Sequence, residues 1–555
     1  MIHYKELDRD TAVWLFYPGE ERRTPYKRSA LTLLVEDTSR EGIRRLVEEE
    51  GLADFALRHD VILAVPVAPR EGWLPTAANL ERLARIHGGI TKPENTPLQF
   101  NSQGIPTLES MMSEYHPMND VRYYAGEGAG ATLALTLAAC RPEMTAAVLA
   151  VNGALPETLP EEASGAPVPV MLLGSAVNAR AYFDGANHAQ PVNAGLDACP
   201  INPVQMVVHD INSARLDGET VERAWETLLR RVRRINTGRR GDVEPRMNLK
   251  ECGFEQVVEQ TLLPDGLKHT WFTHVPSAVK ENPGQKVPLV MFFHGGSDNP
   301  EEAAEMSKLH ELGEREGFIT VYPWGANRCG WNIHLHDFEE DDEAYTLQLI
   351  DYMIAHYPVD PGRVYLSGFS NGAGHALMMG MMHPDVIAAI FPIDSNWPGA
   401  RVGPTDTRPE DVPAFCRAME KKKEKDYRMP VWYTYGTREP SYPVYRGCSQ
   451  QHQYDFYKWF NHIPVRETPP QDAPDPCGCG VPGDVRLHLA PSARHPHHQY
   501  DVQRFFSEDE VPMNLYNYVI MRDKGHEVAQ MDPELGWRYV RHFRREKDGS
   551  LTLIP

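Results

Sequence analysis

Hydrophobic residues in the first 234 positions fall into short runs rich in Val, Leu and Ala, which alternate with longer stretches of mixed polar and apolar residues. The short runs are typical of strands buried on both faces, and the longer stretches are typical of amphipathic helices. We predict strands at 29–35, 61–67, 121–125, 145–151, 168–173 and 203–209, and helices at 41–58, 131–140 and 219–234. This alternation predicts the α/β class, with a mostly parallel sheet that carries helices on both faces.

The same rhythm starts again after residues 235–247, which are charged and contain glycine, as linkers often do. We therefore predict a first domain at 1–234, a linker at 235–247 and a second domain at 248–555. The second domain contains a long Pro-, Cys- and His-containing insertion at 461–512, which we expect to be lid-like. Its elements are predicted as edge strands at 255–261 and 269–274, buried strands at 287–293, 364–366, 387–393, 430–435 and 515–521, and helices at 373–382 and 533–544.

The two domains align with each other without a gap through one strand, one helix and the next strand. An offset of 242 positions (368 minus 126) places Gly126 on Gly368 and Gly130 on Gly372. The same offset places Asn152 on Asp394. Repetition over this length predicts two tandem copies of one fold. The glycines at 126–130 do not have the register of a dinucleotide-binding loop, so we do not expect such a cofactor there.

A candidate nucleophile lies in the second copy. Residues 368–372 read Gly-Phe-Ser-Asn-Gly, between an apolar run of strand formers and a small-residue helical run. A strand, a sharp turn and a helix around G-x-S-x-G expose the serine hydroxyl above the sheet. Ser370 is therefore the expected nucleophile. Gly128 stands at the equivalent position of the first copy, which has no hydroxyl there.

Other groups needed for nucleophilic catalysis follow in the order expected of this fold. Gly295 and Gly296 follow a buried strand and, with the N–H of Asn371, are predicted to form an oxyanion hole. His526, after the last strand, is the expected base. Glu439, after the strand 430–435, is the expected acid.

Asp394, after the strand 387–393, is the alternative acid. The first copy has no carboxylate at 174–177 and no histidine at 211–213, so we predict that it carries no catalytic residues. Ser370, His526 and an acid are sufficient for acyl transfer without a metal or an organic cofactor.

The second copy resembles the polyhydroxybutyrate depolymerase and feruloyl esterase group of α/β-hydrolases over about 260–545. The resemblance rests on motifs that include His294-Gly295-Gly296, 328–332, 360–365, the Ser370 pentad and Gly525-His526. It implies a serine carboxylic ester hydrolase for feruloyl-type or other small acyl esters. It leaves a polyhydroxyalkanoate or acetyl-xylan esterase, or a peptidase or acyltransferase, as alternatives. The group usually has Asp where this chain has Glu439, and it is usually secreted.

We expect the substrate to contact side chains on loops that follow the strands. The candidates are His294, Trp324, Trp331, Trp397 and Tyr442. Because the loops at the carboxyl ends of parallel strands hold ligands in this class of fold, these residues are placed for an acyl group or a sugar. The expected partner is a small-molecule or oligosaccharide-linked ester, and the sequence does not predict an oligomeric state.

Charge and composition exclude several classes of partner and location. A net charge of −21 argues against binding to nucleic acid or to an anionic membrane surface. No apolar run reaches the roughly 18 residues of a membrane-spanning helix, and no secretory signal is visible, so a cytoplasmic protein is expected. The Cys477-x-Cys479 and 495–498 His-Pro-His-His motifs lack the usual spacing of a structural zinc site, so we expect no metal.

Overall fold

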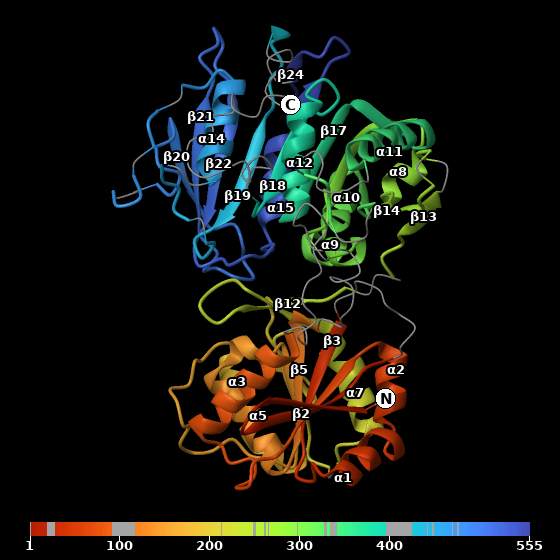
Figure 1. Ribbon diagram of the computed structural model, residues 1–555, viewed down its shortest axis with the longest axis vertical. Helices are drawn as coiled ribbons and strands as arrows, with labels where there is room; N and C mark the ends of the chain where they lie inside the picture. Colours follow the sequence, from red (N-terminus) through yellow and green to blue (C-terminus); the bar gives the residue numbers. More distant parts are fainter. Residues whose placement is uncertain are drawn as a thin grey trace. The chain divides into compact units, whose positions relative to one another are not determined.

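Ten strands form one twisted sheet in the first part of the chain, in the order β1-β2-β4-β3-β5-β6-β7-β10-β9-β8 (Figure 1). In this computed structural model the strands are β1 (Ile2–Asp8), β2 (Thr11–Phe16), β3 (Arg28–Leu34), β4 (Ile62–Pro66), β5 (Pro117–Glu127), β6 (Ala147–Val151), β7 (Val170–Leu173), β8 (Gln190–Asn193), β9 (Leu196–Ala198) and β10 (Met206–Asp210). The central strands from β4 to β10 run parallel, and the pairs at both edges are antiparallel.

The structure describes residues 2–18, 28–91, 117–212, 214–247, 251–259, 262–264, 266–296, 298–326, 330–333, 341–395, 424–440, 442–446, 449–464, 466–468, 470–473 and 477–555. The described residues divide into two units between Met247 and Asn248. The segment predicted as a linker belongs largely to the first unit, because β12 (Asp242–Pro245) pairs with β11 (Val232–Ile235).

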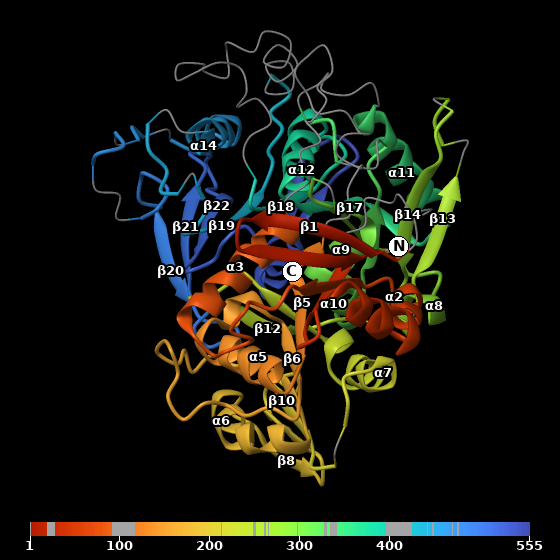
Figure 2. The same cartoon turned by 60° about the horizontal axis from the view of Figure 1, so that its bottom comes forward.

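Each face of the first sheet carries its own layer of helices. Side chains along the strands alternate between two buried clusters, so that Tyr123 faces one and Tyr124 the other. One cluster includes residues of α1 (Arg40–Arg44), α2 (Leu52–His59) and α7 (Gly218–Thr227). The other includes residues of α3 (Ala77–Thr91), α5 (Ala129–Cys140) and α6 (Arg180–Ala186). In Figure 2, α5 and α6 lie on one side of the strands and α2 and α7 on the other.

The second unit repeats this topology. Its sheet has the order β13-β14-β16-β15-β17-β18-β19-β22-β21-β20, which equals the first order with twelve added to every strand number. The strands are β13 (Glu255–Glu259), β14 (His269–His274), β15 (Val287–Phe293), β16 (Ile319–Pro323), β17 (Val359–Phe369), β18 (Ala389–Ile393), β19 (Val431–Gly436), β20 (Val485–Leu489), β21 (Tyr500–Phe506) and β22 (Asn514–Met521). The predicted fold class, with two copies of one α/β fold, is confirmed.

Helices also cover both faces of the second sheet. They are α8 (Ser277–Glu281), α9 (Pro300–Ser307), α10 (Leu309–Glu316), α11 (Asp342–His356), α12 (Asn371–Met382), α14 (Ser449–Phe460) and α15 (Asp532–Val540). In Figure 1, α12 crosses in front of β17 and β18, and α15 lies behind the strands. Helices α15 and α10 meet through the Arg315–Glu534 ion pair, and the ring of Trp537 packs at a tilt against Phe318, which follows α10. A small hairpin, β23 (Phe543–Arg545) with β24 (Leu551–Leu553), closes the chain.

Three predicted helices differ from the structure. The helix predicted at 41–58 is interrupted at Gly51, which has φ 85°, so that α2 begins at Leu52. The helix predicted at 219–234 ends at Thr227, because Arg233 and Arg234 belong to the buried strand β11. The Arg234 guanidinium donates to the backbone oxygens of Thr145 and Gly241. Arg234, which was predicted at the end of a helix, is therefore a buried strand residue. The helix predicted at 533–544 likewise ends at Val540 and is followed by β23.

The insertion at 461–512 is not wholly a lid. It contributes β20 and β21, and β21 pairs antiparallel with β22 along its whole length. The first unit has the same antiparallel extension, with β9 beside β10 and β8 beside β9. The insertion is therefore partly a longer version of a segment that both units share.

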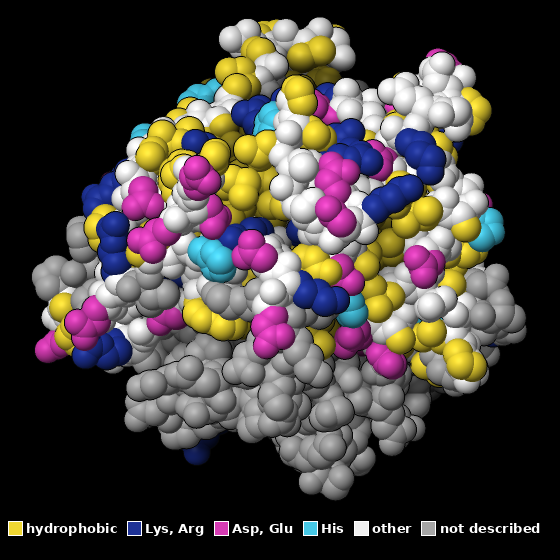
Figure 3. Space-filling view, turned by 90° about the horizontal axis from the view of Figure 1, so that it is seen from above, with side chains coloured by type: hydrophobic (Ala, Val, Ile, Leu, Met, Phe, Trp, Pro, Cys, Tyr) yellow, Lys and Arg dark blue, Asp and Glu magenta, His cyan; other side chains and the backbone are white. Residues whose placement is uncertain are grey.

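The face drawn in Figure 3 mixes acidic, basic and hydrophobic side chains. Asp and Glu groups lie beside Lys and Arg groups on it. Within the described part of the chain, no helix combines the length and the apolar character needed to cross a membrane.

Candidate active site

The turn between β17 and α12 consists of a single residue, Ser370. Its backbone has φ 52° and ψ −119°, a conformation that residues other than glycine adopt only under strain. The turn is held because the Ser370 N–H donates to Ile393 O at 3.0 Å. Gly372 must lack a side chain, since a Cβ there would lie 2.3 Å from Phe293 O. The predicted strand, sharp turn and helix are thus present around Ser370.

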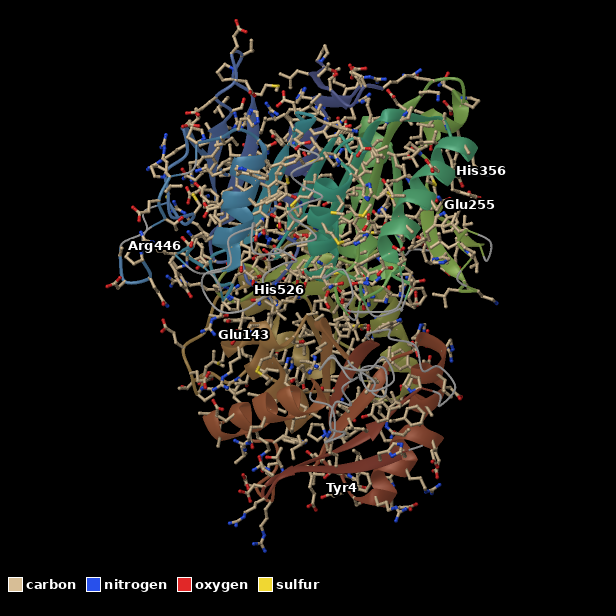
Figure 4. The ribbon with its side chains drawn as sticks, turned by 45° about the horizontal axis from the view of Figure 1, so that its top comes forward. Tyr4, Glu143, Glu255, His356, Arg446 and His526 are labelled. Atoms are coloured by element: carbon tan, nitrogen blue, oxygen red, sulfur yellow. The ribbon has the colours of Figure 1, made fainter. Side chains whose placement is uncertain are left out.

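His526 joins the serine to a carboxylate. Its Nε2 lies 2.8 Å from Ser370 Oγ, and its Nδ1 lies 2.8 Å from Glu439 Oε1. His526 comes from the loop after β22, and its position in the second unit is labelled in Figure 4. The Glu439 side chain is 5% exposed, whereas that of His526 is 48% exposed. The buried Glu439 carboxylate therefore orients the imidazole ring, and the rest of the ring is accessible to solvent.

The environment favours the protonated form of His526. Partial burial lowers its pKa, but the hydrogen bond to Glu439 and the charges of Glu439 and Asp394 together act more strongly in the opposite direction. The net result is a pKa above the ordinary value for histidine. A base of this kind accepts a proton readily and stabilises the imidazolium that results.

Asp394, the alternative acid, has a different partner. Its Oδ2 lies 2.8 Å from Lys524 Nζ, and Lys524 Nζ also lies 3.0 Å from Asp532 Oδ2. All three side chains are fully buried or nearly so. Burial and the nearby charge of Glu439 raise the pKa of Asp394, while Lys524 opposes the rise. Asp394 Oδ2 also accepts from the N–H of Glu527, so it anchors the loop that carries His526.

No sequence motif signals this buried cluster. Lys524 precedes His526 by two residues and resembles an ordinary surface lysine, while Asp532 resembles a helix-terminus residue. Their burial depends on Asp394 at the end of another strand and on Tyr500, whose hydroxyl donates to Asp532 Oδ1 at 2.9 Å. Only the folded sheet brings these positions together.

Replacing Lys524 by methionine is expected to destabilise the second unit by about 3–5 kcal/mol at pH 8, because two buried carboxylates lose their cation. The pKa of Asp394 is already raised in the folded protein. Without Lys524 its folded pKa rises further, so the protonated form becomes the stable one and the loss is smaller at pH 5 than at pH 8. Urea unfolding followed by tryptophan fluorescence at both pH values measures this. Lys280→Met, at an exposed lysine, is the matched control and should change stability by less than about 0.5 kcal/mol. Equal losses at the two pH values would contradict the proposed cause.

Gly296 and Asn371, two residues of the predicted oxyanion hole, lie close together beside Ser370. The N–H of Asn371 lies at the first position of α12, where no helical carbonyl can accept it. A Cβ placed on Gly296 would lie 3.7 Å from Asn371 Cβ, so the two residues are neighbours in space. A Cβ on Gly295 would lie 2.4 Å from Asp298 Oδ2 and 3.1 Å from the ring of Phe369. A side chain at 295 would therefore require the Asp298 carboxylate to move.

His294 is a structural residue in this arrangement. The side chain is fully buried, and its Nε2 accepts from the N–H of Gly325 at 3.1 Å. The proton must then lie on Nδ1, which donates to Gly295 O at 2.7 Å. His294 thus fixes the Gly295–Gly296 peptide rather than contacting a substrate, which differs from our expectation.

Trp331 also differs from our expectation. Its side chain is fully buried, its Nε1 donates to His294 O at 3.0 Å, and its ring stacks on His375 with centroids 4.8 Å apart. The Asn371 side chain holds the Trp331 backbone, with Oδ1 accepting at 2.5 Å and Nδ2 donating at 3.3 Å. Trp331 therefore packs under the site and is not available to a substrate.

The other aromatic candidates are less enclosed. Trp324 and Tyr442 are both half-buried. The N–H of Tyr442 donates to Glu439 O, and its ring lies against Gly478 of the insertion, where a Cβ would be 2.8 Å from Cε2. Trp397 lies outside the described residues.

Sequence reasoning missed Asp342, which is buried and accepts from the backbone N–H groups of Ala326 and Asn332, so that it fixes the loop beside Trp331.

The first unit repeats the turn without the chemistry. Gly128 has φ 58° and ψ −119°, nearly identical to Ser370, and its N–H donates to Val151 O at 2.9 Å. Asn152 and Asp394, which the repeat places at equivalent positions, share a φ of 52°. The backbone of the turn is therefore kept in a unit that has glycine at the nucleophile position.

Residues 275–396 match the family described as Esterase PHB depolymerase. The chain is 36% identical over 129 residues to poly(3-hydroxyalkanoate) depolymerase C of Paucimonas lemoignei, a match covering 22% of this chain and 30% of the relative. It is 29% identical over 108 residues to feruloyl esterase B of Piromyces equi, covering 19% and 20%. The resemblance indicated by the sequence motifs is confirmed for this region.

A solved structure, an acetyl xylan esterase from Aspergillus awamori, aligns with 52% of this chain and 99% of its own, at 14% identity and a TM-score of 0.35. The strand order described above, and not this likeness, assigns the fold. The chain spans less than a third of the length of the two curated relatives that it matches.

Proposed function

We propose that this protein is a serine carboxylic ester hydrolase that acts through an acyl-enzyme, with the second unit as the catalytic one. The observation that carries the proposal is the position of His526, within hydrogen-bond distance of both Ser370 Oγ and Glu439 Oε1. The names of the relatives, which include a polyester depolymerase and a feruloyl esterase, support ester chemistry. In this proposal the first unit, with Gly128 in place of a nucleophile, supplies no catalytic residue.

In the proposed mechanism, Ser370 Oγ attacks the ester carbonyl while its proton moves to His526 Nε2. Glu439 keeps the Nδ1 proton in place and stabilises the imidazolium. The tetrahedral intermediate collapses when the carbon–oxygen bond to the alcohol breaks, and the alkoxide leaves with the proton from Nε2. Water then attacks the acyl-enzyme by the same path in reverse and releases the carboxylic acid.

The negative charge of the intermediate would lie between the N–H of Asn371 and the N–H groups of the Gly295–Gly296 segment. His294 supports this role, because its Nδ1–H holds Gly295 O. In a trans peptide the N–H of Gly296 points opposite to that oxygen. Donors fixed before the reaction cost no reorganisation when the charge develops.

The proposed substrates are feruloyl-type or other small acyl esters, including esters linked to oligosaccharides. Hydrolysis of methyl ferulate, p-nitrophenyl acetate and p-nitrophenyl butyrate, measured with the wild type and Ser370→Ala, tests this. We expect turnover of methyl ferulate that Ser370→Ala lacks. Turnover of the two activated esters alone would reject the feruloyl class but keep the esterase, and no serine-dependent turnover would reject both.

A polyhydroxyalkanoate or acetyl-xylan esterase is the alternative, and the names of two relatives favour it. One is the Paucimonas depolymerase. The other is the bifunctional acetylxylan esterase/xylanase XynS20E of Neocallimastix patriciarum, which is 36% identical over 86 residues that cover 15% of this chain and 12% of the relative. A peptidase or acyltransferase would use the same three side chains. Release of nitroaniline from aminoacyl nitroanilides at rates comparable to ester hydrolysis would favour a peptidase. Release of 3-hydroxybutyrate oligomers or of acetate from acetylated xylan would favour the first alternative.

A further inference from the structure

Three histidines gather in the loop between β20 and β21. The rings of His495 and His498 have centroids 4.8 Å apart, those of His497 and His498 are 5.0 Å apart, and those of His495 and His497 are 5.8 Å apart. One nitrogen from each ring lies within 4.8 Å of the others. His495 is 2% exposed and His498 is fully buried, whereas His497 is exposed. None of the three belongs to the site that contains Ser370.

The loop is held in this shape by its own hydrogen bonds. The N–H of His495 donates to Ser492 Oγ at 2.9 Å, and the N–H of His498 donates to His495 O at 2.9 Å. Ser492 Oγ in turn donates to Gln530 Oε1 at 2.6 Å. The backbone therefore brings the three imidazoles together before any ligand arrives, which lowers the cost of binding one.

The spacing of the rings suits a tetrahedral transition-metal ion. Three imidazoles with Zn–N distances of about 2.0–2.1 Å in tetrahedral directions place their ring centres about 5 Å apart. The observed separations of 4.8, 5.0 and 5.8 Å lie around this value. Imidazole nitrogen is a preferred ligand of Zn²⁺, Cu²⁺, Ni²⁺ and Co²⁺, and a three-histidine site keeps a fourth position for water.

We infer that His495, His497 and His498 form a site for a divalent transition metal, with Zn²⁺ as the best fit. The spacing that led us to expect no metal applies to four-ligand structural sites, whereas this loop supplies three ligands within four residues. The ion would lock the loop against the segments on either side of His526, because Ser492 contacts Gln530 and the N–H of Arg522 donates to Gln499 O at 2.9 Å. This inference does not depend on the proposed esterase activity.

Isothermal titration of the tag-free, full-length, metal-free protein with ZnCl₂ tests the site. We expect the wild type to bind one equivalent, and His497→Ala to bind at least about 100-fold more weakly, since a ligand is lost. His497 is chosen because its exposure makes the variant tolerable for folding. The matched control is His488→Ala, which removes an exposed histidine of the same insertion that is paired with Asp501 at 3.0 Å. It should bind like the wild type.

Co²⁺ provides a second measurement, because a tetrahedral or five-coordinate Co²⁺ absorbs visible light much more strongly than hydrated Co²⁺. The wild type and His488→Ala should show these bands, and His497→Ala should lose them. A wild type that binds no stoichiometric Zn²⁺ would overturn the inference. It would equally be overturned if His497→Ala bound Zn²⁺ like the wild type, or if both variants weakened binding by the same factor.

Discussion

Replacing Ser370 by alanine is expected to lower kcat towards p-nitrophenyl butyrate by about 10⁵-fold, because no other group can form the acyl-enzyme. The substitution removes one oxygen, which lies 2.8 Å from His526 Nε2, and leaves the surrounding backbone bonds in place, so the fold should persist. Initial rates and circular dichroism spectra of the two proteins measure the effect. Activity within tenfold of the wild type in a folded variant would exclude Ser370 as the nucleophile.

The strained turn allows a second comparison with a matched control in the other unit. Ser370→Gly should also be inactive, but roughly 1 kcal/mol more stable, because glycine adopts φ 52° and ψ −119° without strain. Gly128→Ser should leave activity unchanged and lower stability by about the same amount. A Cβ at 128 has space, with its nearest neighbour Glu36 Oε1 at 3.7 Å, so strain rather than collision would be measured. Opposite signs of the two stability changes are the expected result, and a loss of activity in folded Gly128→Ser would contradict an inactive first unit.

The parts of the fold that could be predicted from the sequence are those fixed by local pattern. Fully buried strands such as β15 and β18 are continuous apolar runs, and such runs can be recognised without their partners. The elbow at Ser370 could be predicted because strand, turn residue and helix are adjacent in the chain. The positions of Glu439 and His526 followed from the same reasoning, since each comes directly after a strand of a parallel sheet.

The remaining features depend on contacts between distant segments. Strands β20 and β21 mix polar and apolar residues because they form a sheet edge, and such segments resemble loops. The inward direction of Trp331 is set by His294, from the loop after β15, and by Asn371, at the start of α12. Nothing in the order of residues near 331 indicates whether its indole points to a substrate or to the core. For the same reason, the gathering of His495, His497 and His498 depends on loop geometry that their spacing does not fix.

The choice between two carboxylates was open at the level of sequence, because Glu439 and Asp394 both follow strands at the same end of the sheet. Their contacts make the two variants differ. Glu439→Gln is expected to lower kcat by about 10⁴-fold, since an amide at the His526 Nδ1 position cannot stabilise the imidazolium and favours the wrong tautomer. Asp394→Asn should lower kcat by less than about tenfold, because its carboxylate pairs with Lys524 and makes no hydrogen bond to the His526 ring in the described structure.

The pH dependence of kcat/KM separates a role in protonation from a structural one. His526 must be neutral to accept the Ser370 proton, so activity falls as pH drops through its pKa. That pKa is raised mainly by Glu439 against the effect of burial, so the acidic limb of the wild type lies above the range of an ordinary histidine. In Glu439→Gln the residual activity should have its acidic limb at lower pH, because the neutral imidazole is no longer disfavoured. Asp394→Asn should shift the limb in the same direction by a smaller amount, since only a more distant charge is removed. If Asp394→Asn caused the larger loss of kcat and the larger shift, Asp394 would be the acid and the hydrogen bond from His526 to Glu439 would not be the catalytic one.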